Sequence, residues 1–242
     1  RVSLGHDAHQ RYASLPGSDP QRLAAIGDAV RATLDAAPNA TRINTPLIDI
    51  YAVPAFLSAT ECRQLVTLIN SDVRPSTALK SGQAATHRTS ETCRFSGNDA
   101  LPRTIEKRIA DLLGLEEGNS ESIQGQRYSQ GQKFGLHNDY FAAGQPYSQA
   151  VADEGGQRTW TAMAYCNQPE RGGHTDFPTV PISIPPRAGV LLIWNNLDRN
   201  GMPNRYSHHE GKPVEQGRKY VLTKWFRERP WQGSERSDAL RR

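Results

Sequence analysis

Beyond residue 120 the apolar residues of this chain change from helical spacing to alternation, which limits the folds that it can form. Four short runs of β type follow, separated by clusters of Gly, Pro and Asn: SIQGQRYS, TWTAMAYCN, AGVLLIWNN and KYVLTKWFRE. Many short strands with such turns are typical of a β-sandwich or barrel. Because helical patterns come first, we predict an α+β fold in which N-terminal helices pack on a jelly-roll core.

Three helical patterns precede the strands. The first, DPQRLAAIGDAVRATLDAA, begins with Asp19 as its cap and Pro20 in its first turn. The second follows Ser58, with Glu61 three residues later in a capping-box pattern, and the third runs from Ala100 to Leu115. We therefore divide the chain into a helical extension (1–45), a jelly-roll domain (46–230) and a basic tail (231–242).

Composition excludes several classes of partner. The 242 residues are 36% apolar, which is enough for a globular core, and the net charge of +4 is too small for a broad nucleic-acid-binding face. No apolar run reaches the roughly 18–20 residues that a membrane span needs. The three cysteines form no C-x-x-C pair, so we expect free thiols in a reducing cytoplasm. The sequence leaves the oligomeric state open.

The segment GQKFGLHNDYF places His137 and Asp139 two positions apart. In an extended segment both side chains point to one face, where imidazole and carboxylate can hold a metal ion. His174, His208 and His209 are candidates for a third ligand. Neighbouring strand residues point to opposite sides, and the spacing to the following Gly, Pro and Lys favours His209. Two histidines and a carboxylate suit non-haem Fe(II), although zinc with a bound water uses the same residue types.

Lys219 opens the last β run, and a lysine that points into a jelly roll needs an anion. Tyr128 and Tyr165 lie on the neighbouring predicted strands and offer hydroxyl groups to the same ligand. This group predicts a small co-substrate with two acidic ends, one held by the metal and one by Lys219.

Five segments, in this order, resemble the Fe(II)/2-oxoglutarate dioxygenases, specifically the prolyl 4-hydroxylase branch and its α-subunit catalytic domain. They are QRYSQGQKFGLHNDYF, GGQRTWTAMAYCN, RGGHTDFP, AGVLLIWNN and HEGKPVEQGRKYVLTKWFRE, and they span roughly residues 120–228. FLSATECRQLVTLI and HRTSETCRF extend the resemblance upstream to about residue 47. Residues 1–45 match no part of the family pattern.

The resemblance implies a double-stranded β-helix in which His137, Asp139 and His209 bind Fe(II). It also implies that Lys219 binds the distal carboxylate of 2-oxoglutarate, flanked by Tyr128 and Tyr165.

On the substrate side, Arg88 and the residues up to Phe95 match a mobile loop, and Trp225 matches an aromatic wall. Arg158 is a further candidate for a substrate contact. Two positions depart from the family: Tyr220 stands where Trp is common, and His174 where an acidic residue is common.

The activity implied is hydroxylation of a prolyl residue in a peptide or protein, with dioxygen as oxidant, release of succinate and CO2, and ascorbate as an optional reductant. One alternative keeps the cofactors but uses a free amino acid or another small metabolite as the substrate. A non-catalytic jelly-roll binding module is disfavoured, because all three metal ligands and Lys219 are present.

Overall fold

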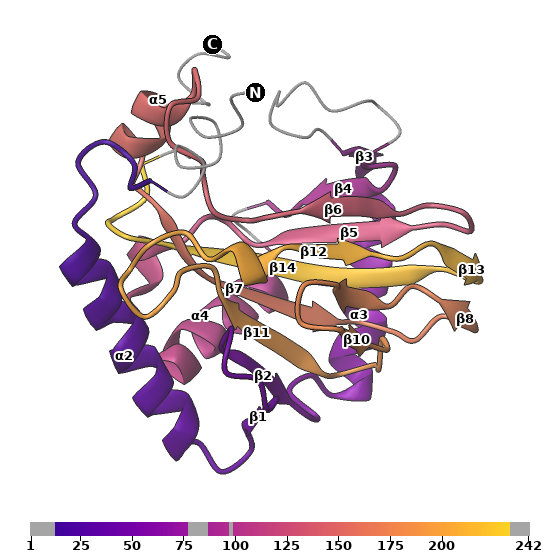
Figure 1. Cartoon of the computed structure of the whole chain (residues 1–242). Coiled ribbons are helices and arrows are strands. Elements are labelled where there is room, and N and C mark those ends of the chain that lie inside the picture. The colour runs from indigo at the N-terminus through magenta and orange to yellow at the C-terminus, as the bar shows by residue number, and fades with distance from the viewer. Residues whose placement is uncertain (1–12, 77–86, 97–98, 233–242) are drawn as a thin grey trace.

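The computed structural model describes residues 13–76, 87–96 and 99–232. These ranges contain the α-helices α2 (Pro20–Ala36), α3 (Ala59–Ser71), α4 (Ala100–Leu113) and α5 (Ser148–Asp153), and short 3-10 turns at Glu117–Asn119 and Arg205–Ser207. Figure 1 shows α2 running beside α4 along one flank of the strands.

Local chemistry sets the ends of these helices. The Asp19 side chain accepts a 2.9 Å hydrogen bond from the Gln21 N–H at the start of α2, and Ser58 and Glu61 form the predicted capping box of α3. α4 stops at Leu113, two residues earlier than predicted, because Gly114 adopts a left-handed backbone with φ of 67°.

Two antiparallel sheets form the β core. The major sheet has the strand order β1 (Thr41–Arg42), β2 (Ile50–Val53), β11 (Leu191–Asn195), β7 (Arg158–Tyr165), β14 (Lys219–Arg227), β5 (Gln124–Tyr128), β4 (Glu91–Arg94), β3 (Val73–Pro75). The minor sheet has the order β10 (Ile182–Ile184), β9 (Thr175–Phe177), β12 (His209–Gly211), β6 (Phe134–His137). A separate pair joins β13 (Val214–Gln216) to β8 (Arg171–Gly172).

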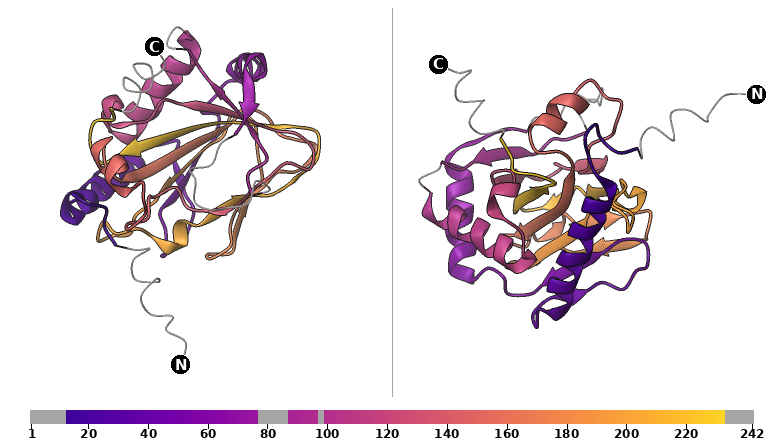
Figure 2. Two further views of the ribbon diagram at one scale, coloured as in Figure 1. Left: turned by 90° about the horizontal axis from the view of Figure 1, so that it is seen from above. Right: turned by 90° about the vertical axis from the view of Figure 1, so that its left-hand side faces the viewer.

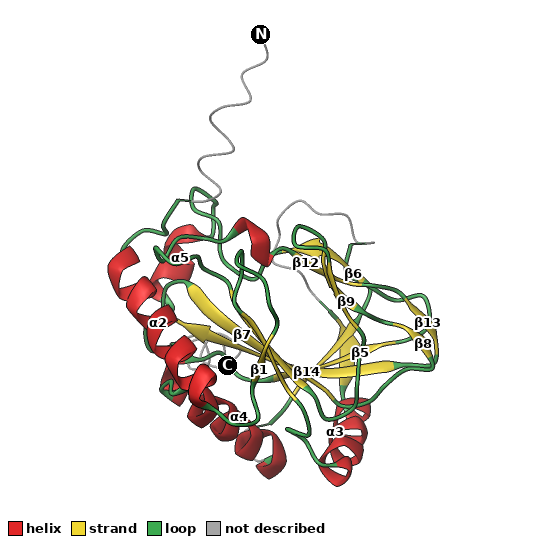
Figure 3. Cartoon of the chain, turned by 60° about the horizontal axis from the view of Figure 1, so that its bottom comes forward, coloured by secondary structure: helices red, strands yellow, loops and turns green. Residues whose placement is uncertain are grey.

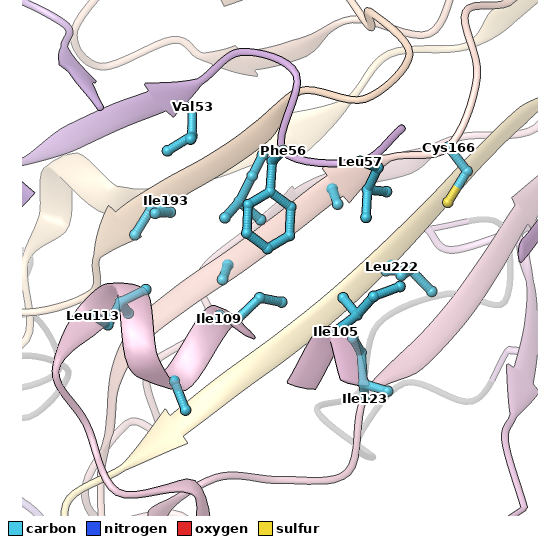
Figure 4. Packing of buried hydrophobic residues seen from close by; sticks show 14 of the residues in the cluster. Val53, Phe56, Leu57, Ile105, Ile109, Leu113, Ile123, Cys166, Ile193 and Leu222 are labelled. Carbon is cyan, nitrogen blue, oxygen red and sulfur yellow. The ribbon is translucent and has the colours of Figure 1, made fainter. Parts of the chain in front are cut away.

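The helices cover one face of the major sheet. Figure 3 shows α2, α3 and α4 on one side of the long strands, with β6, β9 and β12 on the other, and the right-hand view of Figure 2 shows the helical flank. Leu222 of β14 packs there with Ile105 and Ile109 of α4 (Figure 4). α3 approaches β5 at Gly125, where a Cβ atom would lie 2.5 Å from Ile69. This layer is a closed apolar core.

The opposite face of the major sheet meets the minor sheet in a second cluster. Tyr165, Trp194 and Val221 of the major sheet pack there with Phe177 of β9. Odd-numbered residues of β7 and β14 face this interior, whereas even-numbered ones face the helices. The predicted α+β fold with a jelly-roll core and helices packed on it is confirmed.

Residues 13–45 pack on the same core. Val30 and Leu34 belong to the apolar cluster under the helices, and β1 pairs with β2. The division at residue 45 stays a prediction, and residues 233–242 of the predicted tail lie outside the described residues. One expectation was wrong: Glu91–Arg94, predicted as part of a mobile loop, forms strand β4 between β3 and β5.

Two expectations from composition concern membranes and cysteines. Among the described residues, no helix combines the length and the apolar content needed to cross a bilayer. Cys62, Cys93 and Cys166 are buried and free of disulfides.

Candidate metal and co-substrate site

His137, Asp139 and His209 converge at the mouth of the barrel. His137 ends β6 and His209 begins β12, directly opposite it in the antiparallel pairing. The Asp139 carboxylate lies between the rings, with one oxygen 4.0 Å from His137 Nε2 and the other 3.8 Å from His209 Nε2. One ligand atom from each residue lies within 4.8 Å of the others. The geometry brings the three predicted ligands to one point.

Asp139 reaches the two histidines by a bend in the chain rather than by the strand alternation that we predicted. We expected His137 and Asp139 to share a face of one extended segment, but β6 ends at His137 and Asp139 lies in the bend that follows. Asp139 therefore depends on tertiary contacts for its position. Thr161 of β7 supplies one of them, donating a 2.8 Å hydrogen bond to Asp139 Oδ2, and Asn196 Nδ2 donates a 2.9 Å bond to the Thr161 hydroxyl.

Backbone carbonyls orient both histidine rings. His137 Nδ1 lies 2.8 Å from the Gly135 carbonyl and His209 Nδ1 lies 2.9 Å from the Ser207 carbonyl. A proton on each Nδ1 satisfies these contacts and leaves the Nε2 lone pairs directed at Asp139. Burial, with a contribution from His209, lowers the pKa of His137, so its ring is held neutral.

The carboxylate is held in its charged form. Burial alone would raise the pKa of Asp139, but the adjacent His209 and His137 rings and Arg158 lower it overall. Two imidazoles and a carboxylate on one side of a centre match the open facial donor set that suits Fe(II). The donor chemistry therefore fits the metal predicted from the sequence.

Aromatic rings enclose the two histidines. The ring of Phe134 stacks on that of His137 with centroids 3.5 Å apart, and Trp194 meets His209 edge-on at 4.8 Å. Phe177 lies 5.5 Å from His209. These rings restrict the imidazoles to one orientation and exclude water from that side of the site.

Lys219 lies deeper in the barrel with 3% of its surface exposed. Its Nζ is 3.5 Å from the Thr175 hydroxyl and 5.5 and 5.4 Å from the ring centres of Tyr128 and Tyr165. Burial lowers the pKa of Lys219 to about 7. Among the described residues, no carboxylate oxygen lies within ion-pairing distance of Nζ. A buried ammonium of this kind fits an incoming carboxylate, such as the distal one of 2-oxoglutarate.

The two tyrosines differ in their partners. The Tyr165 hydroxyl donates a 2.8 Å hydrogen bond to Thr175, so that this threonine connects Tyr165 with Lys219. Tyr128 ends β5 opposite Lys219 in the strand pairing. Burial raises the pKa of both phenols, which keeps them neutral hydrogen-bond donors.

The substrate-side candidates lie on two sides of the metal site. Arg88 places its guanidinium 4.6 Å from the ring centre of Phe134 and donates to the Ser90 hydroxyl. Arg158 is paired with Glu121 through two 2.6 Å contacts. Its guanidinium lies 4.3 Å from the ring centre of Trp225. Their contact with substrate stays a prediction.

His208 and His174 are not part of the cluster. The half-buried His208 directs Nδ1 to the Arg205 carbonyl, 2.8 Å away. Sequence analysis missed Thr161 and Thr175, which hold Asp139 and Lys219. The alternation of β7 contained a signal for Thr161, because it shares the face of Tyr165, whereas Thr175 is on a three-residue strand without a readable pattern.

Comparisons with known proteins agree with this geometry. The family model of the 2OG-Fe(II) oxygenase superfamily matches residues 123–227, which include the three clustered residues and Lys219. "Probable prolyl 4-hydroxylase 3" of Arabidopsis thaliana is 32% identical over 195 residues, covering 71% of this chain, and the chain spans 66% of that relative's length. Prolyl 4-hydroxylase 5 of the same plant is 31% identical, with 71% of this chain and 65% of the relative covered.

A solved structure gives the same result. The viral collagen prolyl hydroxylase of Paramecium bursaria Chlorella virus-1, in complex with 2OG, superposes with a TM-score of 0.59 at 27% identity. That match covers 74% of this chain and 95% of the viral one. The chain therefore belongs to the 2OG-Fe(II) oxygenase superfamily, in its prolyl 4-hydroxylase branch, and its cofactors are Fe(II), 2-oxoglutarate and dioxygen.

Proposed function

We propose that this chain hydroxylates a prolyl residue in a peptide or protein, with release of succinate and CO2. The observation that carries the proposal is the His137–Asp139–His209 cluster together with the buried Lys219, which has no carboxylate partner among the described residues. His137, Asp139 and His209 would hold Fe(II), and Lys219 would anchor a carboxylate of the co-substrate. The bound metal supplies the activation of dioxygen.

The protein contributes position and shielding. Lys219 and the Tyr165–Thr175 pair fix the distal carboxylate of 2-oxoglutarate, so that the other end of the molecule reaches the metal in one orientation. Thr161 keeps the Asp139 carboxylate from rotating. Phe134 and Trp194 restrict the access of water to the reactive centre.

A prolyl substrate is supported by the names of the relatives and of the viral structure. A prolyl hydroxylase from Trichoplax adhaerens, solved with a peptide fragment of hypoxia inducible factor, shares the fold at 18% identity. In this chain the guanidinium of Arg88 lies over the ring of Phe134, which stacks on His137, and Arg158 lies over the ring of Trp225 and reaches the Asp139 carbonyl. We assign them to the substrate side.

The test is incubation with proline-containing peptides, Fe(II) and 2-oxoglutarate, followed by mass spectrometry and succinate measurement. We expect a mass gain of one oxygen atom on proline and one succinate per hydroxylation. His209→Ala should abolish both products, whereas His208→Ala, at the adjacent position outside the metal cluster, should retain them. Succinate release without any peptide product would contradict the prolyl substrate and favour a small metabolite.

We place the enzyme in the cytoplasm, a proposal supported by its three buried free thiols. Burial raises the pKa of Cys93 to about 11, which keeps this thiol protonated and unreactive. The absence of long nucleic acid among its partners stays a prediction from the net charge.

A further inference from the structure

The position of Asp139 depends on the segment that follows it. Because β6 ends at His137, no strand pairing fixes the backbone of Asp139 or of Tyr140 and Phe141. Thr161 holds the carboxylate, and Arg158 Nη1 reaches the Asp139 carbonyl at 3.5 Å. The remaining contacts of this segment are made by Tyr140 and Phe141, both of which are about 5% exposed.

Gln157 takes the place of a strand partner for Phe141. Its Oε1 accepts a 2.7 Å hydrogen bond from the Phe141 N–H, and its Nε2 donates a 2.9 Å bond to the Phe141 carbonyl. Gln157 is 1% exposed, so these bonds are made away from water. One side chain therefore satisfies both backbone groups two residues after the metal ligand.

Glu228 connects this point to the start of the chain. Its side chain has no exposed surface and accepts hydrogen bonds from the Gln157 N–H at 3.4 Å, the Ser18 hydroxyl at 2.6 Å and the Asp19 N–H at 3.2 Å. Arg22 forms an ion pair with the same carboxylate. The start of α2 is thus attached, through Glu228, to the residue just before β7 that holds the Phe141 backbone.

Apolar contacts make the same connection independently. Leu15 packs with Phe141 and Val151, and Leu23 packs with Tyr140 and Leu197. Both leucines are 3% exposed or less. In the N-terminal segment, polar residues bind Glu228, and a leucine on each side of them packs against the residues that follow Asp139, which we call the metal-ligand loop (Tyr140 and Phe141).

We propose that residues 15–23, which we name the N-terminal buttress, position Asp139 through Tyr140, Phe141 and Gln157, and so set the affinity of the chain for Fe(II). The proposal rests on the metal site of the proposed function. It gives a role to part of the extension for which the sequence pattern of the family offered none. The buttress residues touch neither metal nor substrate, so they act as positioning residues.

The test compares two leucines of the same helix by anaerobic Fe(II) titration and thermal melting of the full chain. Leu23 faces the metal-ligand loop, whereas Leu34 faces the apolar core under α4. We expect Leu23→Ala to weaken Fe(II) binding about ten-fold, the scale seen when outer partners of a metal ligand are removed. Leu34→Ala should lower the melting temperature at least as much and leave the Fe(II) affinity unchanged.

A milder variant keeps the test open if Leu23→Ala does not fold. Ser18→Ala removes one hydrogen bond to Glu228 and should weaken Fe(II) binding by a smaller factor in the same direction. If the unaltered chain, Leu23→Ala and Ser18→Ala bound Fe(II) with equal affinity, the proposed role of the N-terminal buttress would be wrong. The proposed metal site would not be affected by that result. Failure of the unaltered chain to bind Fe(II) would overturn both proposals.

Discussion

Two buried lysines on β14, Lys219 and Lys224, lie five residues apart and therefore on opposite faces of the major sheet. Lys224 points toward the helices, where its Nζ contacts Glu106 at 2.9 Å and the Glu121 carbonyl at 3.1 Å. Lys219 points into the barrel and contacts the Thr175 hydroxyl and two tyrosine rings. Burial lowers the pKa of both lysines. They differ in that Lys224 has a carboxylate partner, Glu106, whereas Lys219 has none among the described residues. The helical face is complete by itself, whereas the barrel face requires an anion from outside.

Lys219→Ala should produce the largest functional effect. Loss of a buried charge partner of the ligand costs about 2–5 kcal/mol, so we expect the KM for 2-oxoglutarate to rise about 30-fold or more. The stability without co-substrate should not fall, because the variant removes a buried cation that has no acidic partner among the described residues. Steady-state kinetics and thermal melting check both expectations, and an unchanged KM would remove the distinction between the two lysines.

Lys224→Met should show the reverse behaviour. Glu106 would lose its ion pair, and we expect the free energy of unfolding to fall by about 2 kcal/mol, less than for a fully buried pair because Glu106 is 15% exposed. The KM for 2-oxoglutarate should stay at its original value. Chemical denaturation and kinetics on the same samples would refute the comparison if the KM rose with the loss of stability.

The affinity for 2-oxoglutarate should depend on pH. Lys219 is protonated below its pKa of about 7 and loses its charge above it, so binding of the dianion at higher pH requires uptake of a proton. We expect the dissociation constant to be constant below pH 7 and to rise by up to about ten-fold per unit above it. Lys219→Arg should remove this dependence, because guanidinium stays charged. Calorimetry in buffers of different ionisation enthalpy measures the proton uptake directly, and its absence would contradict the lowered pKa.

Thr175→Val should have the smallest effect. It removes the hydroxyl that accepts from Tyr165 and lies near Lys219, at a cost of about 1 kcal/mol or about five-fold in the KM for 2-oxoglutarate. Thr159→Val is the matched control, since that hydroxyl donates to the Phe226 carbonyl and contacts neither residue. Equal KM values for the two variants would show that Thr175 does not position Lys219.

Sequence patterns revealed those parts of this arrangement that repeat locally. The β run that begins at Lys219 was recognised, and the residue types at the helix starts identified Asp19 and Ser58 as caps. The predicted cluster of His137, Asp139 and His209 also forms, although the bend after β6 was not foreseen. A two-residue spacing indicates a shared face only while the strand continues.

Other contacts left no local pattern. Glu228 meets Ser18 across 210 positions, and Gln157 binds the backbone of Phe141 rather than its side chain. No periodicity connects residues so far apart, and a backbone acceptor places no demand on the residue type. The residues that position the site could therefore not be predicted from the sequence, whereas its metal ligands could.

The place of β14 has a consequence for how the chain reaches this structure. It is the last strand in sequence, yet it lies in the middle of the major sheet, between β7 and β5. During synthesis, β1, β2, β11 and β7 on one side and β5, β4 and β3 on the other have no shared partner in that sheet until residues 219–227 leave the ribosome. Glu228, which anchors the first helix, emerges later still. The two halves of the major sheet therefore join only after β14 has been made, and until then the edges of β7 and β5 are open to chaperones or to another nascent chain.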